Sequence, residues 1–109
     1  MKVSQLAAKA GLNSLSEYDD REIEGVYISD MVSDIITGAK ANSILVTLQT
    51  HKSLIAAANL VDVAAVVFAR GRTPSEDTVE LARKAGIALF VTQEDTWSFA
   101  VKLNEIGIT

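Results

Sequence analysis

The sequence predicts an α/β protein, a single domain over residues 1–109 with a mainly parallel sheet and helices on both faces. Segments rich in β-branched and apolar residues alternate with segments of helical periodicity. Residues 64–69 (Ala-Ala-Val-Val-Phe-Ala) are apolar throughout, as expected for a strand buried on both faces of a parallel sheet. The connections are short, which favours right-handed strand–helix–strand units.

The first quarter of the chain is expected to form one helix and two strands. Val3 to Ala10 has apolar residues on one helical face, and Gly11 follows as a C-cap. Leu12 to Ser16 is interpreted as a short edge strand, and Ile23 to Ile28 alternates well enough for a second strand. The acidic run from Glu17 to Glu22 between them is interpreted as a solvated loop, with a divalent-cation site as the alternative.

From Ser29 onward, helices and strands should alternate. Ser29-Asp30 is the N-cap candidate for the next helix. Residues 73–76 (Thr-Pro-Ser-Glu) resemble a helix start, with the threonine as cap and the proline at the first helical position. Gly86 and Gly107 close the last two helices, and Asp95 caps the final one. The expected helices are 31–40, 51–60, 74–85 and 96–106, and the expected strands are 43–48, 64–69 and 87–92, with Ile44, Val46, Val66, Phe68, Leu89 and Val91 in the core.

Composition narrows the function classes. Ten basic and fourteen acidic residues give a net charge of 10 − 14 = −4, and no basic stripe is present to neutralise nucleic-acid phosphates. With no cysteine and one histidine, disulfides, thiolate catalysis and a multi-histidine metal site are excluded. The longest apolar run, Val63 to Ala69, is far shorter than the ~20 residues that span a membrane. No signal-peptide apolar region follows Met1, so we expect a cytoplasmic protein without cofactor, nucleic-acid or membrane partner.

Polar residues gather in the loops that follow the expected strands. Parallel strands bring these loops to one edge of the sheet, where open α/β folds bind ligands. Each loop also leads into a helix N-terminus, whose free N–H groups favour anions. The hypothetical ligand-binding residues at this edge are Ser29, Asp30, Thr50, His51, Lys52, Arg70, Gly71, Arg72, Thr92 and Asp95.

Each of these residues also has a simpler interpretation. His51 is the one side chain that titrates near neutral pH, so it is a candidate base or ligand contact, or else a polar first-turn residue. Arg70 and Arg72 are spaced to approach one anion, or else they stay solvated and meet Glu76 or Asp77. Polar residues occur at this edge in any parallel α/β fold, so the site remains a hypothesis.

Several short segments match the pattern of a known domain family. Residues 24–31 (Glu-Gly-Val-Tyr-Ile-Ser-Asp-Met) are similar to the strand–helix start of DRTGG domains, and residues 95–97 (Asp-Thr-Trp) to the family's Asp-Thr-Tyr segment. The strand segments 43–47, 65–68 and 86–92, with Thr73-Pro74, extend the resemblance from about Lys2 to Ile106. The resemblance implies a fold similar to the N-terminal, non-kinase domain of HPr kinase/phosphorylase.

The residues that name the family are mostly replaced. Thr50-His51 stands where the family has Asp-Arg, and Ala69-Arg70-Gly71 stands where it has Thr-Gly-Gly. Such domains occur beside CBS domains in regulatory pyrophosphatases, before the catalytic domain of some phosphotransacetylases, and alone. Stand-alone members also occur in gene clusters of iron-hydrogenase subunits. The resemblance therefore implies a regulatory role and a protein partner in a metabolic or hydrogenase-related system.

Two functions are in competition, and a third is least favoured. The first is a non-catalytic regulatory domain that acts through protein contacts in energy or redox metabolism. The second is a sensor that binds a nucleotide or other anionic metabolite at the carboxyl edge of the sheet. An enzyme is least favoured, because the chain has no phosphate loop, dinucleotide fingerprint or nucleophile elbow. A homodimer is expected if Tyr27, Trp97 and Phe99 leave apolar surface uncovered, and a monomer if these aromatics lie in the core.

Overall fold

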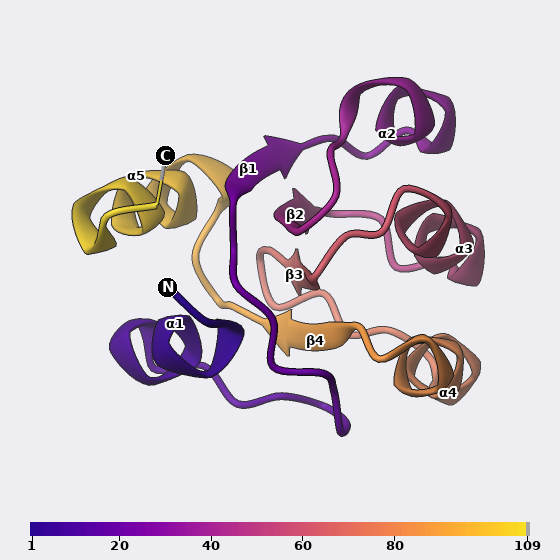
Figure 1. Ribbon diagram of the computed structural model, residues 1–109, viewed down its shortest axis with the longest axis horizontal. Coiled ribbons are helices and arrows are strands. Elements are labelled where there is room, and N and C mark those ends of the chain that lie inside the picture. The colour runs from indigo at the N-terminus through magenta and orange to yellow at the C-terminus, as the bar shows by residue number, and fades with distance from the viewer. Residues whose placement is uncertain (109) are drawn as a thin grey trace.

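The computed structural model describes residues 1–108 and arranges them as a sheet between two layers of helices (Figure 1). The elements are α1 (Val3–Ala10), β1 (Gly25–Ile28), α2 (Val32–Gly38), β2 (Ser43–Thr47), α3 (Lys52–Leu60), β3 (Ala65–Phe68), α4 (Glu76–Ala85), β4 (Ala88–Val91) and α5 (Thr96–Ile106). Helices α2, α3 and α4 cover one face of the sheet, and α1 and α5 cover the other. The predicted α/β fold with helices on both faces is confirmed.

The strand order follows the chain. All neighbouring strands are parallel, in the order β1-β2-β3-β4. Right-handed crossovers that advance in one direction leave their helices on one face, which explains why α2, α3 and α4 lie together. After β4 the chain crosses to the other face, where α5 packs beside α1.

Two apolar layers fill the space on either side of the sheet. Alternate strand residues point to opposite faces, so each interior strand supplies both layers. Ile44 and Val46 pack with α1 and α5, and every residue of β3 is buried. This two-sided burial is why the sequence of β3 is apolar throughout. Of the predicted core residues, Ile44, Val46, Val66, Phe68 and Leu89 are fully buried, and Val91 is partly buried against the same core.

The expected strand at Leu12–Ser16 is wrong. Leu15 donates its N–H to the carbonyl of Leu89 at 2.9 Å, and the next backbone bond to this edge joins Asp19 to Gly86 at 3.0 Å. Two bonds that far apart form no continuous ladder, so the segment runs along β4 as an irregular cover. Phe99 was expected at the surface in the dimer hypothesis, and it is fully buried on α5.

Two helix starts also differ from the prediction. Helix α2 begins after Met31, whose N–H binds the Ser29 hydroxyl at 3.2 Å, so Asp30 is not its cap. Helix α4 begins after Ser75, two residues later than the expected Thr73 cap. The first turn of α4 is anchored by Thr78, whose hydroxyl donates to the Thr50 carbonyl at 3.2 Å. The start of α2 thus involves a local turn at Ser29, whereas the start of α4 involves a contact with another loop, which the local pattern does not contain.

Candidate functional site

The structure places the loops with the predicted site residues along the carboxyl edge of the sheet. The β1–α2, β2–α3, β3–α4 and β4–α5 loops follow neighbouring parallel strands and therefore end at the same edge. Neighbouring loops contact each other through hydrogen bonds. The edge is thus one continuous row of polar groups, and the question becomes which of those groups remain available to a ligand.

Asp30 ties the first loop to the second. Its carboxylate accepts the backbone N–H of Leu48 at 2.7 Å and the hydroxyl of Thr47 at 3.0 Å. These bonds occupy one oxygen of the carboxylate and hold negative charge at this end of the edge. Asp30 therefore joins β1 to β2 and makes this part of the edge unfavourable for an anion.

His51 is the N-cap of α3. Its Nδ1 accepts the backbone N–H of Ser53 at 3.1 Å and lies 2.9 Å from the hydroxyl of the same residue. An Nδ1 that accepts an N–H leaves the proton of a neutral imidazole on Nε2. The residue is exposed, and no hydrogen bond of residues 1–108 uses Nε2. The geometry matches the simpler interpretation, in which His51 starts the helix, and leaves one ring nitrogen free.

The connections diverge between β3 and β4. The chain leaves β3 toward α4 on one face and leaves β4 toward α5 on the other, and such a point in an open sheet normally opens a crevice for ligands. Here the two loops are bonded together. Arg70 donates its N–H to the Glu94 carbonyl at 2.8 Å, and Gly71 donates its N–H to the Thr92 carbonyl at 2.8 Å. The backbone donors that would hold an anion are therefore used within the protein.

The conformation of this bridge depends on Gly71. Arg70 and Gly71 are consecutive left-handed residues, with φ of 59° and 68°. A Cβ on Gly71 would lie 2.6 Å from the Gln93 side-chain oxygen. The glycine that remains from the family triplet thus has a structural reason, because it lets two loops approach each other.

The arginines and Lys52 are the free charges of the edge. Among residues 1–108, neither Arg70, Arg72 nor Lys52 lies within 4.0 Å of a carboxylate, and all three are exposed. The expected pairing with Glu76 or Asp77 therefore does not form at that distance. Asp95 caps α5 by accepting the Ser98 N–H at 2.7 Å. This bond, with a smaller contribution from Arg70, holds the pKa of the Asp95 carboxyl below its usual range.

The acidic loop near the N-terminus binds other parts of the chain. Asp20 accepts the N–H and the hydroxyl of Ser4 at 2.8 and 2.6 Å, and Glu22 pairs with the N-terminal amine at 2.9 Å. Within residues 1–108 no group of three or more histidine or acidic side chains is arranged to hold a metal ion. No helix in the described part of the chain is long and apolar enough to cross a membrane.

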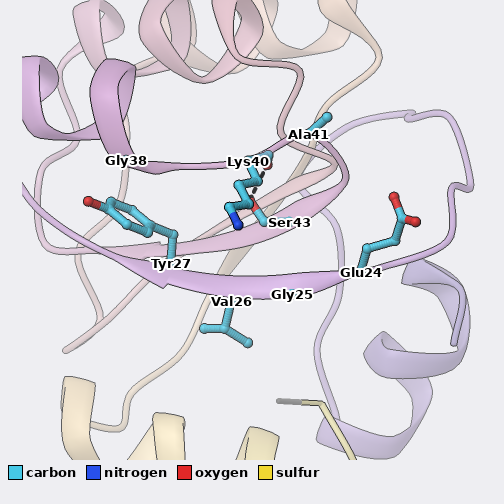
Figure 2. Close-up of a pocket in the computed structure, with 8 residues that line it drawn as sticks. All are labelled: Glu24, Gly25, Val26, Tyr27, Gly38, Lys40, Ala41 and Ser43. Atoms are coloured by element: carbon cyan, nitrogen blue, oxygen red, sulfur yellow. Dashed lines mark hydrogen bonds between the residues drawn. The ribbon is translucent and has the colours of Figure 1, made fainter.

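A cavity that the sequence did not indicate lies beside β1, between the strand and the loop after α2 (Figure 2). Its volume is about 410 Å³. Tyr27 forms one wall, and its hydroxyl donates to the Asp34 carboxylate at 3.0 Å, which raises the pKa of the tyrosine. A Cβ on Gly38 would overlap that hydroxyl, so only glycine fits at this position. A glycine inside an expected helix was the one feature of the sequence that could have indicated this cavity. The lining residues are Glu24, Gly25, Val26, Tyr27, Gly38, Lys40, Ala41 and Ser43.

Comparison with known proteins adds the family and the fold. The family model of the DRTGG domain matches residues 3–106, and no curated protein matches the chain. The chain is similar to a crystal structure of the CBS and DRTGG domains of the regulatory region of Clostridium perfringens pyrophosphatase, complexed with its activator diadenosine tetraphosphate. The TM-score is 0.73 at 15% identity, over 93% of this chain and 45% of that one. The chain therefore spans less than half of that structure, and the likeness shows the fold.

Proposed function

The chain belongs to the DRTGG domain family, and we propose that it is a non-catalytic regulatory domain that acts through protein contacts as a homodimer. One observation carries this proposal. At the point where an α/β sheet would open a ligand crevice, the N–H groups of Arg70 and Gly71 are bonded to the neighbouring loop. Two further polar residues of the edge serve the fold, since Asp30 binds the next loop and His51 caps a helix. A regulatory domain needs a stable surface for a partner and no such crevice.

A second candidate function is a sensor of a nucleotide or another anionic metabolite at the same edge. It is favoured by the exposed Lys52, Arg70 and Arg72, whose charges no carboxylate within 4.0 Å compensates in residues 1–108. It is also favoured by the pyrophosphatase regulatory region with a similar fold, which was solved with a nucleotide activator. Arginine is well suited to phosphate because its guanidinium binds two oxygens at once.

Thermal unfolding with added ligands distinguishes the two functions. A ligand at a hundredfold excess over its dissociation constant stabilises the folded state by about 2.7 kcal/mol. In a domain of this size that corresponds to a rise in Tm of roughly 10–20 °C. The probes are ATP, ADP, diadenosine tetraphosphate and inorganic phosphate, each at millimolar concentration. The regulatory proposal predicts no shift, and a saturable shift would favour the sensor.

Matched variants locate any shift that is found. Arg72→Gln removes a free charge from the proposed edge. Arg83→Gln is the control, because Arg83 is paired with Glu80 on α4. A shift that Arg72→Gln abolishes and Arg83→Gln keeps would assign the sensor site to the carboxyl edge. A shift that both variants keep would place the ligand elsewhere.

A further inference from the structure

The two edge strands of the sheet differ in whether another segment covers them. The outer edge of β4 is covered by the irregular segment 12–19, which binds it through Leu15 and Asp19. No described residue forms a hydrogen bond with the outer edge of β1. An uncovered edge strand is a template for pairing with another strand, and proteins normally cover or charge such an edge.

The backbone of β1 shows which groups are open. Ser29 donates its N–H to the Val46 carbonyl at 3.2 Å, and the groups of a parallel strand alternate in direction. Tyr27 therefore faces β2, while Val26 and Ile28 direct their N–H and C=O groups outward. β1 pairs only with β2, and among residues 1–108 no turn, loop or cap forms a backbone hydrogen bond with Val26 or Ile28. The side chains nearby are also apolar and exposed, with Ile28 at 47% and Met31 at 62%.

We propose that β1 pairs antiparallel with β1 of a second copy, around a two-fold axis at Tyr27. This proposal rests on the homodimer of the proposed function and names the surface that forms it. Val26 would lie opposite Ile28 of the second copy, and Ile28 opposite its Val26. Residues paired in this way exchange both backbone hydrogen bonds, so the sheet continues across both copies. The outward N–H and C=O groups of Val26 and Ile28 lie symmetrically on either side of Tyr27. A two-fold contact requires such a self-complementary surface.

The charges along the edge support a second copy as the occupant. Asp30 and Asp34 lie where β1 ends and α2 begins, and Lys40 follows the end of α2, beside the start of β1. Antiparallel pairing puts the start of one strand opposite the end of the other. Lys40 forms no ion pair among residues 1–108, and the pairing would place it near the acidic end of the second copy. Glu24 lies at the same end as Lys40 and keeps its negative charge; the Asn42 amide donates to its carboxylate at 2.6 Å and holds that side chain at the start of β2.

The cavity beside β1 agrees with the same arrangement. Figure 2 shows Tyr27 on the α2 side of β1 and Val26 on the opposite side. Residues directly opposite at a non-hydrogen-bonded position lie closest across an antiparallel pair, so the two Tyr27 rings would meet over the axis. Each cavity of about 410 Å³ would then be closed by the other copy.

Sedimentation equilibrium at micromolar concentration tests the proposal with three variants. The wild type should have twice the monomer mass of 11.7 kDa. Ile28→Pro removes an outward N–H from each copy, and Ile28→Lys puts a charge on the edge, as natural edge strands do. Because Ile28→Pro deletes two hydrogen bonds per dimer, the dissociation constant of the dimer should rise by about tenfold or more. Leu60→Lys is the control, a change at a more exposed apolar residue on α3 that should leave the dimer intact.

Hydrogen exchange gives a second readout that needs no variant. The amides of Val26 and Ile28 should become protected as protein concentration rises, while those of other exposed loops should not. A wild type that stays at 11.7 kDa up to about 0.1 mM would overturn the homodimer and its surface together. A dimer that both Ile28 variants retain, with both amides exchanging freely, would overturn the β1 surface and leave the homodimer standing.

Discussion

Truncation of Phe68 to alanine is the sharpest test of the sheet as the core of this protein. Phe68 is fully buried at the end of β3, next to Val91 on β4 in the sheet register. It belongs to the apolar layer that includes Leu54 of α3 and Ala82 of α4. Core truncations of phenylalanine cost about 3–5 kcal/mol. Because the walls of this site belong to separate elements, the space cannot close without moving a helix, and we expect the upper half of that range.

The measurement is urea unfolding followed by far-ultraviolet circular dichroism, at one fixed protein concentration because a dimer makes stability concentration-dependent. Trp97→Ala is the matched control, since this aromatic is 76% exposed and its loss should cost no more than about 0.5 kcal/mol. If Phe68→Ala lost less than about 1 kcal/mol, or as little as Trp97→Ala, β3 would not be the central buried strand and the argument would fail.

Three further outcomes are expected. Gly71→Ala should destabilise by about 1–2 kcal/mol in urea unfolding, because the residue is left-handed, whereas Gly25→Ala, which meets open space, should be neutral or stabilising by up to about 1 kcal/mol. The pKa values of Asp95 and Asp20 are lowered by hydrogen bonds from Ser98 and Ser4, so their contribution to stability is present above the unfolded pKa of about 3.8 and is lost as the pH falls through the lower folded values. Asp95→Asn keeps a capping side chain and should flatten the acid limb of a Tm-against-pH profile; an unchanged limb would contradict the assignment. The purified domain should not phosphorylate HPr with radiolabelled ATP, because phosphoryl transfer needs a phosphate cradle and positioned metal, and label above a no-protein control would contradict the non-catalytic proposal.

The features that the sequence predicted are those with a local signal. Helix α1 and its Gly11 cap, the closing glycines at 86 and 107, and the Asp95 cap follow from residues within a turn of each other. Strand β3 could be predicted from its own residues, because a strand buried on both faces has apolar residues at every position. The loops expected at the carboxyl edge follow from the same alternation of strands and helices.

Contacts between distant segments decided the rest. Leu12–Ser16 was predicted as an edge strand, yet a strand exists only where a neighbour offers a ladder, and Leu89 offers one bond. Asp30 has the residue type of a cap, and only the fold brings it to the N–H of Leu48. The bond from Gly71 to Thr92, which closes the expected crevice, joins two loops that no local pattern relates. The sequence determined the five helices and the four strands of the sheet, because propensity and burial pattern act within one element. The tertiary structure decided that residues 12–16 form no strand and which polar groups stay free, because a hydrogen bond between segments depends on where both of them lie.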